Sequence, residues 1–104
     1  MATKLQLQVW QKLNEIPKGK ITTYKLLASA IESRAIRAVA SAVGKNPNAP
    51  QTPCHRVVPS SGKIGNYTHP LGVSRKIELL KSEGVELDNK DNIVDFKDKL
   101  YEFK

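Results

Sequence analysis

Apolar residues recur at helical spacing in the first sixteen positions of the chain. Thr3 is followed three residues later by Gln6, the arrangement of a capping box that starts a helix. The turn formers Pro17-Lys18-Gly19-Lys20 then mark where this helix ends. The pattern therefore predicts one amphipathic helix, whose buried stripe is Leu5, Val9, Leu13 and Ile16.

Three further helices are predicted by the same periodicity. The threonines of an extended link, Ile21-Thr22-Thr23, can cap the second helix, and Gly84 is typical of the residue that stops the last one. The predicted helices cover Tyr24 to about Ile31, roughly Arg34 to Val43, and about Val73 to Glu83, where the apolar stripe is Val73, Ile77 and Leu80.

Extended structure is expected in one more place. Val57-Val58 and Ile64 flank the turn formers Pro59-Ser60-Ser61-Gly62-Lys63, which predicts a β-hairpin or wing. The fold class expected is mainly α, a winged helix-turn-helix-like DNA-binding domain over residues 1–86. Residues 87–104 form an acidic C-terminal extension with enough apolar side chains to dock on the core.

The third predicted helix is rich in small residues and carries two arginines. Arg34 and Arg37 are three positions apart and share one helix face, and small residues let a helix backbone approach a surface closely. Two successive helices, the second small and basic, are typical of a helix-turn-helix. An ordinary alanine-rich core helix with two exposed arginines explains the pattern equally well.

Charge is distributed unevenly along the 104 residues, which suffice for one small domain. The net charge is +7, but seven of the ten acids and only four of the seventeen bases lie from Glu83 onward. Residues 1–82 therefore carry thirteen bases against three acids, a net of +10. Such density favours a polyanionic partner, most often nucleic acid, although a solvated basic surface is the plain alternative.

The single cysteine lies in the run Pro53-Cys54-His55-Arg56-Val57-Val58. An imidazole beside a thiol can accept its proton and raise the reactive thiolate fraction. A buried, inert cysteine is the alternative, since free cysteine is among the most buried residue types. One cysteine excludes an internal disulfide and no zinc-ligand spacing is present, so we expect a reducing intracellular location, cytoplasmic and nucleoid-associated or nuclear, with no membrane span.

Taken in order, several motifs resemble one family, the active-site domain of the O6-alkylguanine-DNA alkyltransferases (methylated-DNA–protein-cysteine methyltransferases). The resemblance spans about residues 5 to 86, and the run Pro-Cys-His-Arg-Val is its most specific part. The motifs are Trp10, Ile16 to Lys20, Thr23-Tyr24, Arg34 to Val39, Gly44 to Pro47, Pro53 to Val58, Gly65-Asn66-Tyr67 and Leu79 to Gly84.

The resemblance implies a single-use reaction on alkylated DNA. Cys54 would take the alkyl group from the O6 atom of a flipped-out guanine, with His55 as general base through a water molecule and Glu83 orienting His55. Asn46 would sit at the hinge between the DNA-reading helix and the active-site strand. No cofactor or metal is implied, because the cysteine itself receives the group.

The same resemblance assigns DNA contacts and a base pocket. Arg37 would enter the duplex from the minor groove and fill the gap left by the flipped base, and Tyr24 would lie beside the target phosphate and could donate a proton to the leaving guanine. Further DNA contacts are expected from Arg34, Thr23, Ala38 and Lys45, and the pocket from Tyr67, Val57, Val58, Pro50 and Thr68. The partner expected is double-stranded DNA with O6-alkylguanine, bound by a monomer.

Some features depart from the repair enzymes. Many members carry an additional N-terminal domain, whereas this chain begins where the active-site domain begins, and the stretches Pro50-Gln51-Thr52 and Thr68-His69-Pro70 differ from the usual residues. The length and the extension also resemble the alkyltransferase-like proteins, which bind the same lesions without repairing them and recruit nucleotide excision repair. A non-catalytic lesion sensor is thus the alternative function, and Cys54 is the main argument against it.

Overall fold

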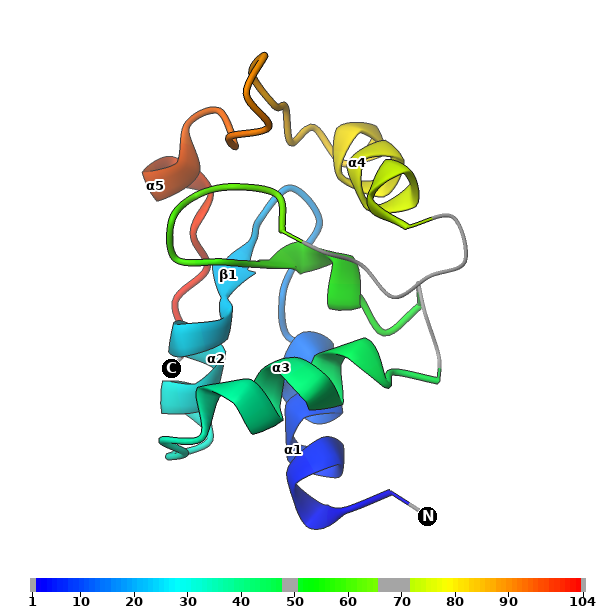
Figure 1. Cartoon of the computed structure of the whole chain (residues 1–104), viewed down its shortest axis with the longest axis vertical. Helices are drawn as coiled ribbons and strands as arrows, with labels where there is room; N and C mark the ends of the chain where they lie inside the picture. Colours follow the sequence, from blue (N-terminus) through cyan, green and yellow to red (C-terminus); the bar gives the residue numbers. More distant parts are fainter. Residues whose placement is uncertain (1, 48–50, 66–71, 104) are drawn as a thin grey trace.

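The computed structural model describes residues 2–47, 51–65 and 72–103. Figure 1 shows the helices of the N-terminal part at one end of the molecule and those of the C-terminal part at the other, with a short strand pair between them. The elements in chain order are α1 (Lys4–Leu13), β1 (Thr22–Thr23), α2 (Tyr24–Ala30), α3 (Ile36–Gly44), η1 (Cys54–Arg56, a 3-10 helix), β2 (Val57–Val58), α4 (Val73–Ser82) and α5 (Phe96–Lys99).

The predicted capping signals are confirmed at the helix ends. The Thr3 side chain accepts a hydrogen bond from Gln6 N while the Gln6 side chain accepts one from Thr3 N, which completes the capping box of α1. Thr23 caps α2 by accepting from Leu26 N. Gly84 ends α4 in the left-handed region at φ +88°, and the bond from Val85 N to Leu80 O closes the helix end.

The third helix begins two residues later than predicted, at Ile36. Ser33 Oγ accepts a hydrogen bond from Ala35 N at 3.1 Å, and Ala35 has φ −87° and ψ +69°, outside the helical region. This local turn competes with the helix for the backbone and holds Arg34 just before its first turn. The helix α3 packs against both α1 and α2.

The predicted hairpin around Pro59–Lys63 is wrong in its strand pairing. β2 pairs in parallel with β1, with Thr22 opposite Val57 and Thr23 opposite Val58. The turn itself forms, since Gly62 N donates to Pro59 O, but Lys63 bridges antiparallel to Asn92 instead. Both valines of β2 are fully buried, and a strand buried on both faces belongs in the interior rather than in an exposed wing.

The strand pair divides the hydrophobic core into two clusters. Successive side chains of a strand point to opposite faces, so Val57 joins the cluster formed with α1, α2 and α3, and Val58 joins the cluster formed with α4 and the C-terminal segment. The first cluster is Val9, Leu13, Ile16, Leu27, Ala28, Val39, Ala42, Val43, Cys54 and Val57; the second is Ile21, Val58, Ile64, Leu80, Val85 and Ile93.

The C-terminal segment packs back on both clusters, as its apolar content predicts. Phe96 and Leu100 lie against the second cluster, and Tyr101 and Phe103 against the first. Leu100 also forms a parallel bridge with Ile21, whose carbonyl accepts from Tyr101 N at 2.7 Å. The division into residues 1–86 and 87–104 stays a prediction. Within the described ranges, no helix combines the length and the apolar character needed to span a membrane.

Candidate active site

Cys54 opens η1, the short helical turn that leads into β2. Its position is set by two backbone bonds: Cys54 N donates to Thr52 O at 2.9 Å, and Arg56 N donates to Pro53 O at 3.1 Å. The side chain is only 5% exposed and belongs to the first core cluster. A thiol held in this way has a fixed position and little contact with solvent, which restricts how a reactant could meet it.

His55 and Glu83 meet although they are 28 residues apart. The Nε2 atom of His55 lies 3.0 Å from Oε2 of Glu83, and the imidazole is 1% exposed. An ionised carboxylate only accepts, so Nε2 carries the hydrogen and Nδ1 is the acceptor in the neutral ring. Among the described residues, Nδ1 of His55 is buried and has no hydrogen-bond partner. The ring therefore offers one nitrogen for taking up a proton.

Arg56 contacts Glu83 and Ile16 closely, although no role for it was expected from the sequence. Its Nε donates to Glu83 Oε1 at 2.9 Å and its Nη2 donates to Glu83 Oε2 at 2.6 Å, a two-point pair in which both side chains are largely buried. Its Nη1 donates to Ile16 O at 2.6 Å. His55, Arg56 and Glu83 together are called the buried cluster below.

The electrostatic balance keeps His55 neutral and Glu83 charged. Burial lowers the pKa of His55 most, and the positive charges of Arg56 and Lys76 lower it further, against the opposing effect of Glu83. Burial alone would raise the pKa of Glu83, but the hydrogen bonds and charges of Arg56 and His55 outweigh it and lower the pKa. The cluster is thus a carboxylate that orients a neutral base.

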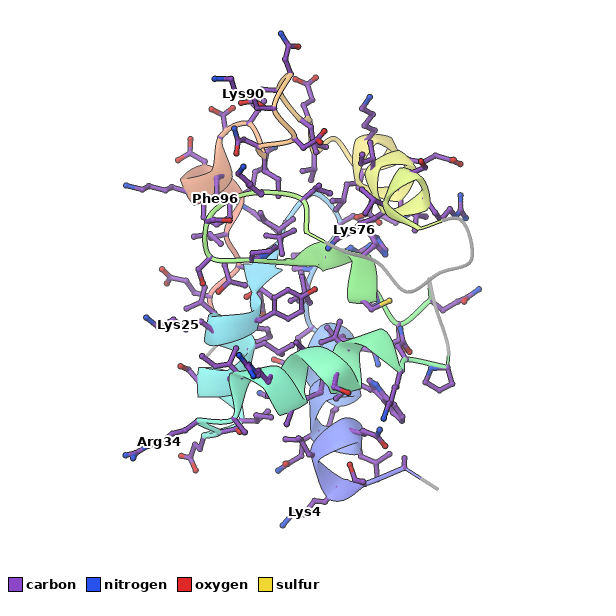
Figure 2. All side chains as sticks on the ribbon, in the orientation of Figure 1. Lys4, Lys25, Arg34, Lys76, Lys90 and Phe96 are labelled. Atoms are coloured by element: carbon purple, nitrogen blue, oxygen red, sulfur yellow. The ribbon has the colours of Figure 1, made fainter. Side chains whose placement is uncertain are left out.

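Lys76 lies inside the molecule, 1% exposed, and was not expected at the site. Figure 2 shows it between α4 and the segment that carries β2, whereas Lys4, Lys25 and Arg34 extend outward from the periphery. Burial lowers the pKa of Lys76 to about 8, while the nearby Cys54 acts to raise it. The sequence did hold a signal, because Lys76 follows Val73 by three residues and so falls in the apolar stripe of Val73, Ile77 and Leu80.

Two predicted residues border Cys54. Tyr24, at the start of α2, packs against the first cluster, and its pKa is raised by burial and then by Cys54, which keeps the phenol protonated. Asn46 follows α3, and its Nδ2 donates to Thr52 O at 2.6 Å. The same carbonyl accepts a hydrogen bond from Cys54 N. Asn46 therefore links the end of α3 to the backbone segment that precedes Cys54.

The residues predicted to touch DNA at α3 are all exposed. Arg37 and Ala38 lie in the first turn of the helix, Arg34 lies just before it, and Lys45 is its C-cap. The buried residues of the helix are Val39, Ala42 and Val43. The chain thus presents Arg37 on a small-residue helix, while the assignment of α2 and α3 as a helix-turn-helix stays a prediction.

The remaining predicted site residues are either buried or lie outside the residues that the structure describes. Thr23 is 4% exposed and its hydroxyl caps α2, so a structural role accounts for it, and its DNA contact stays a prediction. Val57 and Val58 are buried, with their backbone paired to β1. The predicted pocket residues Tyr67, Thr68 and Pro50 lie outside the described residues. In the described part of the chain, no group of histidine, cysteine and acidic residues could hold a metal ion.

The sequence of the chain is similar to the sequences of proteins from one family. The sequence model of the "6-O-methylguanine DNA methyltransferase, DNA binding domain" family matches residues 4–85. The bifunctional transcriptional activator and DNA repair enzyme Ada of Escherichia coli is 49% identical over 82 residues, which cover 78% of this chain and 23% of that protein. A methylated-DNA–protein-cysteine methyltransferase of Candida glabrata is 39% identical over 105 residues, covering 98% and 50%. The chain thus spans half or less of these curated relatives.

Solved structures show the same fold. A Mycobacterium tuberculosis OGT in complex with DNA is 42% identical, with a TM-score of 0.74 over 80% of this chain and 51% of that chain. An S. pombe protein in complex with damaged DNA containing O6-carboxymethylguanine has a TM-score of 0.81 over 99% and 100% of the two chains, at 23% identity. The second likeness is one of fold alone, but it includes the C-terminal segment.

Proposed function

Because the chain belongs to the 6-O-methylguanine DNA methyltransferase family, we propose that it repairs DNA by transferring an alkyl group from O6 of guanine to Cys54. The observation that carries this proposal is the buried thiol of Cys54, next in the chain to a His55 whose imidazole is held by Glu83. A sensor that only binds the lesion does not need the thiol. Each molecule would act once, since the thioether product has no route back to the thiol.

The proposed step balances in atoms and charge. The Cys54 sulfur attacks the alkyl carbon, a sulfur–carbon bond forms, and the bond from that carbon to guanine O6 breaks. The thiol proton goes to Nδ1 of His55 through a water molecule, while Glu83 stabilises the charged imidazole from the other side. The leaving guanine takes a proton from the phenol of Tyr24, which its raised pKa keeps protonated until that point. The imidazolium of His55 then returns the thiol proton to the Tyr24 phenolate through water, so that both side chains end neutral.

The exposed face of α3 supports the DNA-binding half of the proposal. A stacked base is out of reach of Cys54, so the nucleotide must leave the duplex at a cost of a few kcal/mol. Arg37 would enter the minor groove and occupy the vacancy, with Arg34 and Lys45 beside the phosphates. Phosphate attraction of this kind is independent of sequence, as a lesion binder requires. The partner would be double-stranded DNA carrying O6-alkylguanine.

A non-catalytic lesion sensor that recruits nucleotide excision repair is the second candidate. The observation that favours it is the fold match to the S. pombe protein over nearly all of both chains, including the C-terminal segment. The two candidates share the DNA-binding face and differ only at Cys54. The two functions are therefore distinguished by whether the Cys54 sulfur becomes alkylated, and not by the affinity for DNA.

Intact-protein mass spectrometry tests the proposal directly. The protein is incubated with a duplex that carries one O6-methylguanine, and a gain of one methyl group on Cys54 is expected at a one-to-one limit. The Cys54→Ser variant is the matched control and gains nothing. Unchanged mass together with selective binding to the same duplex would establish the sensor in place of the repair protein. Equal affinity for damaged and intact duplex, with no transfer, would overturn both.

A further inference from the structure

We propose that Arg56 is a positioning residue of the transfer reaction: it fixes the Glu83 carboxylate so that His55 keeps Nε2 toward Glu83 and leaves Nδ1 as the proton acceptor. The inference rests on the proposed function for its chemical meaning. The orientation and the tautomer of the His55 imidazole can be measured whether or not the protein transfers an alkyl group. Arg56 touches no reacting atom, so it acts only through Glu83 and His55.

The contacts of the guanidinium define this role. Its fork engages both oxygens of Glu83, at 2.9 and 2.6 Å, so the carboxylate can neither rotate nor shift without losing a bond. Oε2 is shared, because it also faces His55 Nε2 at 3.0 Å. The guanidinium is planar and rigid, which transfers its own fixed position to the carboxylate and from there to the imidazole.

Arg56 is itself anchored to a separate part of the fold. Its Nη1 donates to the carbonyl of Ile16 in the turn that follows α1, and Ile16 N in turn donates to Leu13 O at the helix end. The turn after α1 also lies close to the main chain of Glu83. A Cβ atom placed on Gly19 would lie 3.3 Å from Glu83 O, so the backbone of the turn runs close to the backbone of Glu83. The turn thus lies close to the Glu83 main chain and is linked to the Glu83 side chain through Arg56.

The charge of Arg56 matters as well as its shape. The charged groups that act on His55 are Glu83, Arg56 and Lys76. Glu83 favours the protonated imidazole, while Arg56 and Lys76 oppose it together with burial. Removal of Arg56 would leave Glu83 with one partner, strengthen its pull on the imidazole proton, and raise the pKa of His55. A protonated imidazole has no free acceptor and cannot take the thiol proton.

Nitrogen-15 NMR of the imidazole rings tests the proposal on the whole chain. The chain has two histidines, and a His55→Gln variant assigns the signal of His55. The unmodified protein is expected to show one neutral tautomer, with the hydrogen on Nε2. Arg56→Lys keeps the charge but loses the fork, so we expect a mixture of tautomers and a transfer rate lower by roughly tenfold or more. Arg56→Gln removes the charge, and we expect the pKa of His55 to rise by about one unit.

Arg75→Gln is the matched control, because Arg75 forms an exposed pair with Glu78 on α4 at 2.8 Å. It should leave the tautomer, the pKa of His55 and the transfer rate unchanged. Should Arg56→Gln fail to fold, Arg56→Lys alone decides. A single unchanged tautomer and an unchanged rate in Arg56→Lys, with only a lower melting temperature, would reduce Arg56 to a structural residue. Absence of transfer in the unmodified protein would defeat the proposed function, whereas the NMR result would still decide the role of Arg56.

Discussion

The buried cluster and the outer face of α3 use charge in opposite ways. In the cluster, His55, Arg56 and Glu83 lie almost wholly inside and contact one another at 2.6 to 3.0 Å. The side chains of Arg37 on α3 and of Arg34 just before it are exposed and, within the described part of the chain, form no hydrogen bond or ion pair. One set of charges is satisfied by the fold, and the other is left for a partner.

This difference follows from the solvent around each set. A charge taken out of water is destabilising unless it is paired and hydrogen-bonded, so the cluster can exist only with all its members present. Charges that stay in water need no partner and remain available to phosphates, whose binding releases counterions. The fold therefore ties the proposed chemistry to the stability of the protein and would leave the proposed DNA recognition independent of it. Substitutions in the two regions should separate these properties.

The largest effect is expected from Cys54→Ser, which replaces the sulfur by oxygen and leaves the rest of the side chain unchanged. Transfer should fall to zero, because a hydroxyl is far less reactive than a thiolate at neutral pH. Affinity for a duplex with O6-methylguanine should stay within about twofold, since the face of α3 is untouched. Mass spectrometry and a fluorescence-anisotropy titration of the same samples check the two halves. Loss of binding together with transfer would break the proposed separation.

Glu83→Gln is expected to damage both stability and transfer. It leaves the Arg56 guanidinium buried without its anionic partner, which typically destabilises a protein by about 3–5 kcal/mol. Urea unfolding measures this loss, and single-turnover kinetics measure a fall in transfer of about 100-fold or more. Glu15→Gln is the control, since Glu15 forms a partly exposed pair with Lys12 and should change stability by well under 1 kcal/mol.

The same carboxylate gives a pH dependence with a defined sign. The folded state lowers the pKa of Glu83 below its usual 4.5, so the ionised pair stabilises the fold above that value. This contribution is lost as the pH falls from about 4.5 through the lowered pKa. Unfolding measured between pH 6 and pH 3 should show the loss in the unmodified protein and a flatter curve in Glu83→Gln. Parallel curves would exclude Glu83 as its source.

Lys76→Met should change the alkaline side of the stability curve. The pKa of Lys76 is about 8 in the folded protein against 10.5 in the unfolded chain, so the unfolded state binds more protons between these values. Stability should therefore rise with pH in that window, by at most about 3 kcal/mol, and the variant should lack this rise. Lys81→Met, on the exposed side of the same helix, should keep it.

Arg37→Ala is expected to give the smallest effect and the most selective one. Affinity for the damaged duplex should fall by roughly tenfold, and the slope of log K against log salt should decrease by about one. The melting temperature should not change, because Arg37 has no partner to lose in the described structure. Lys18→Ala, an exposed cation in the turn after α1, is the control. An unchanged lesion affinity in Arg37→Ala would place DNA recognition elsewhere.

The sequence predicted those features that depend on neighbours along the chain. Thr3 and Gln6 form the expected capping box, Thr23 caps α2, and Gly84 ends α4, because each rests on hydrogen bonds or backbone angles within a few residues. The pairing of Cys54 with His55 is likewise visible in the printed residues. The family resemblance added Glu83, which no local pattern could connect to His55.

The tertiary structure decided whatever depends on residues far apart. It paired β2 with β1 instead of with the following segment, brought Arg56 to both Glu83 and Ile16, and enclosed Lys76 beside the site. Such contacts form only when distant elements pack and exclude water, and only then does a charge need a partner. The sequence alone determined the helices and pointed to the candidate reactive residues, while packing determined their partners, since burial is a property of the whole fold.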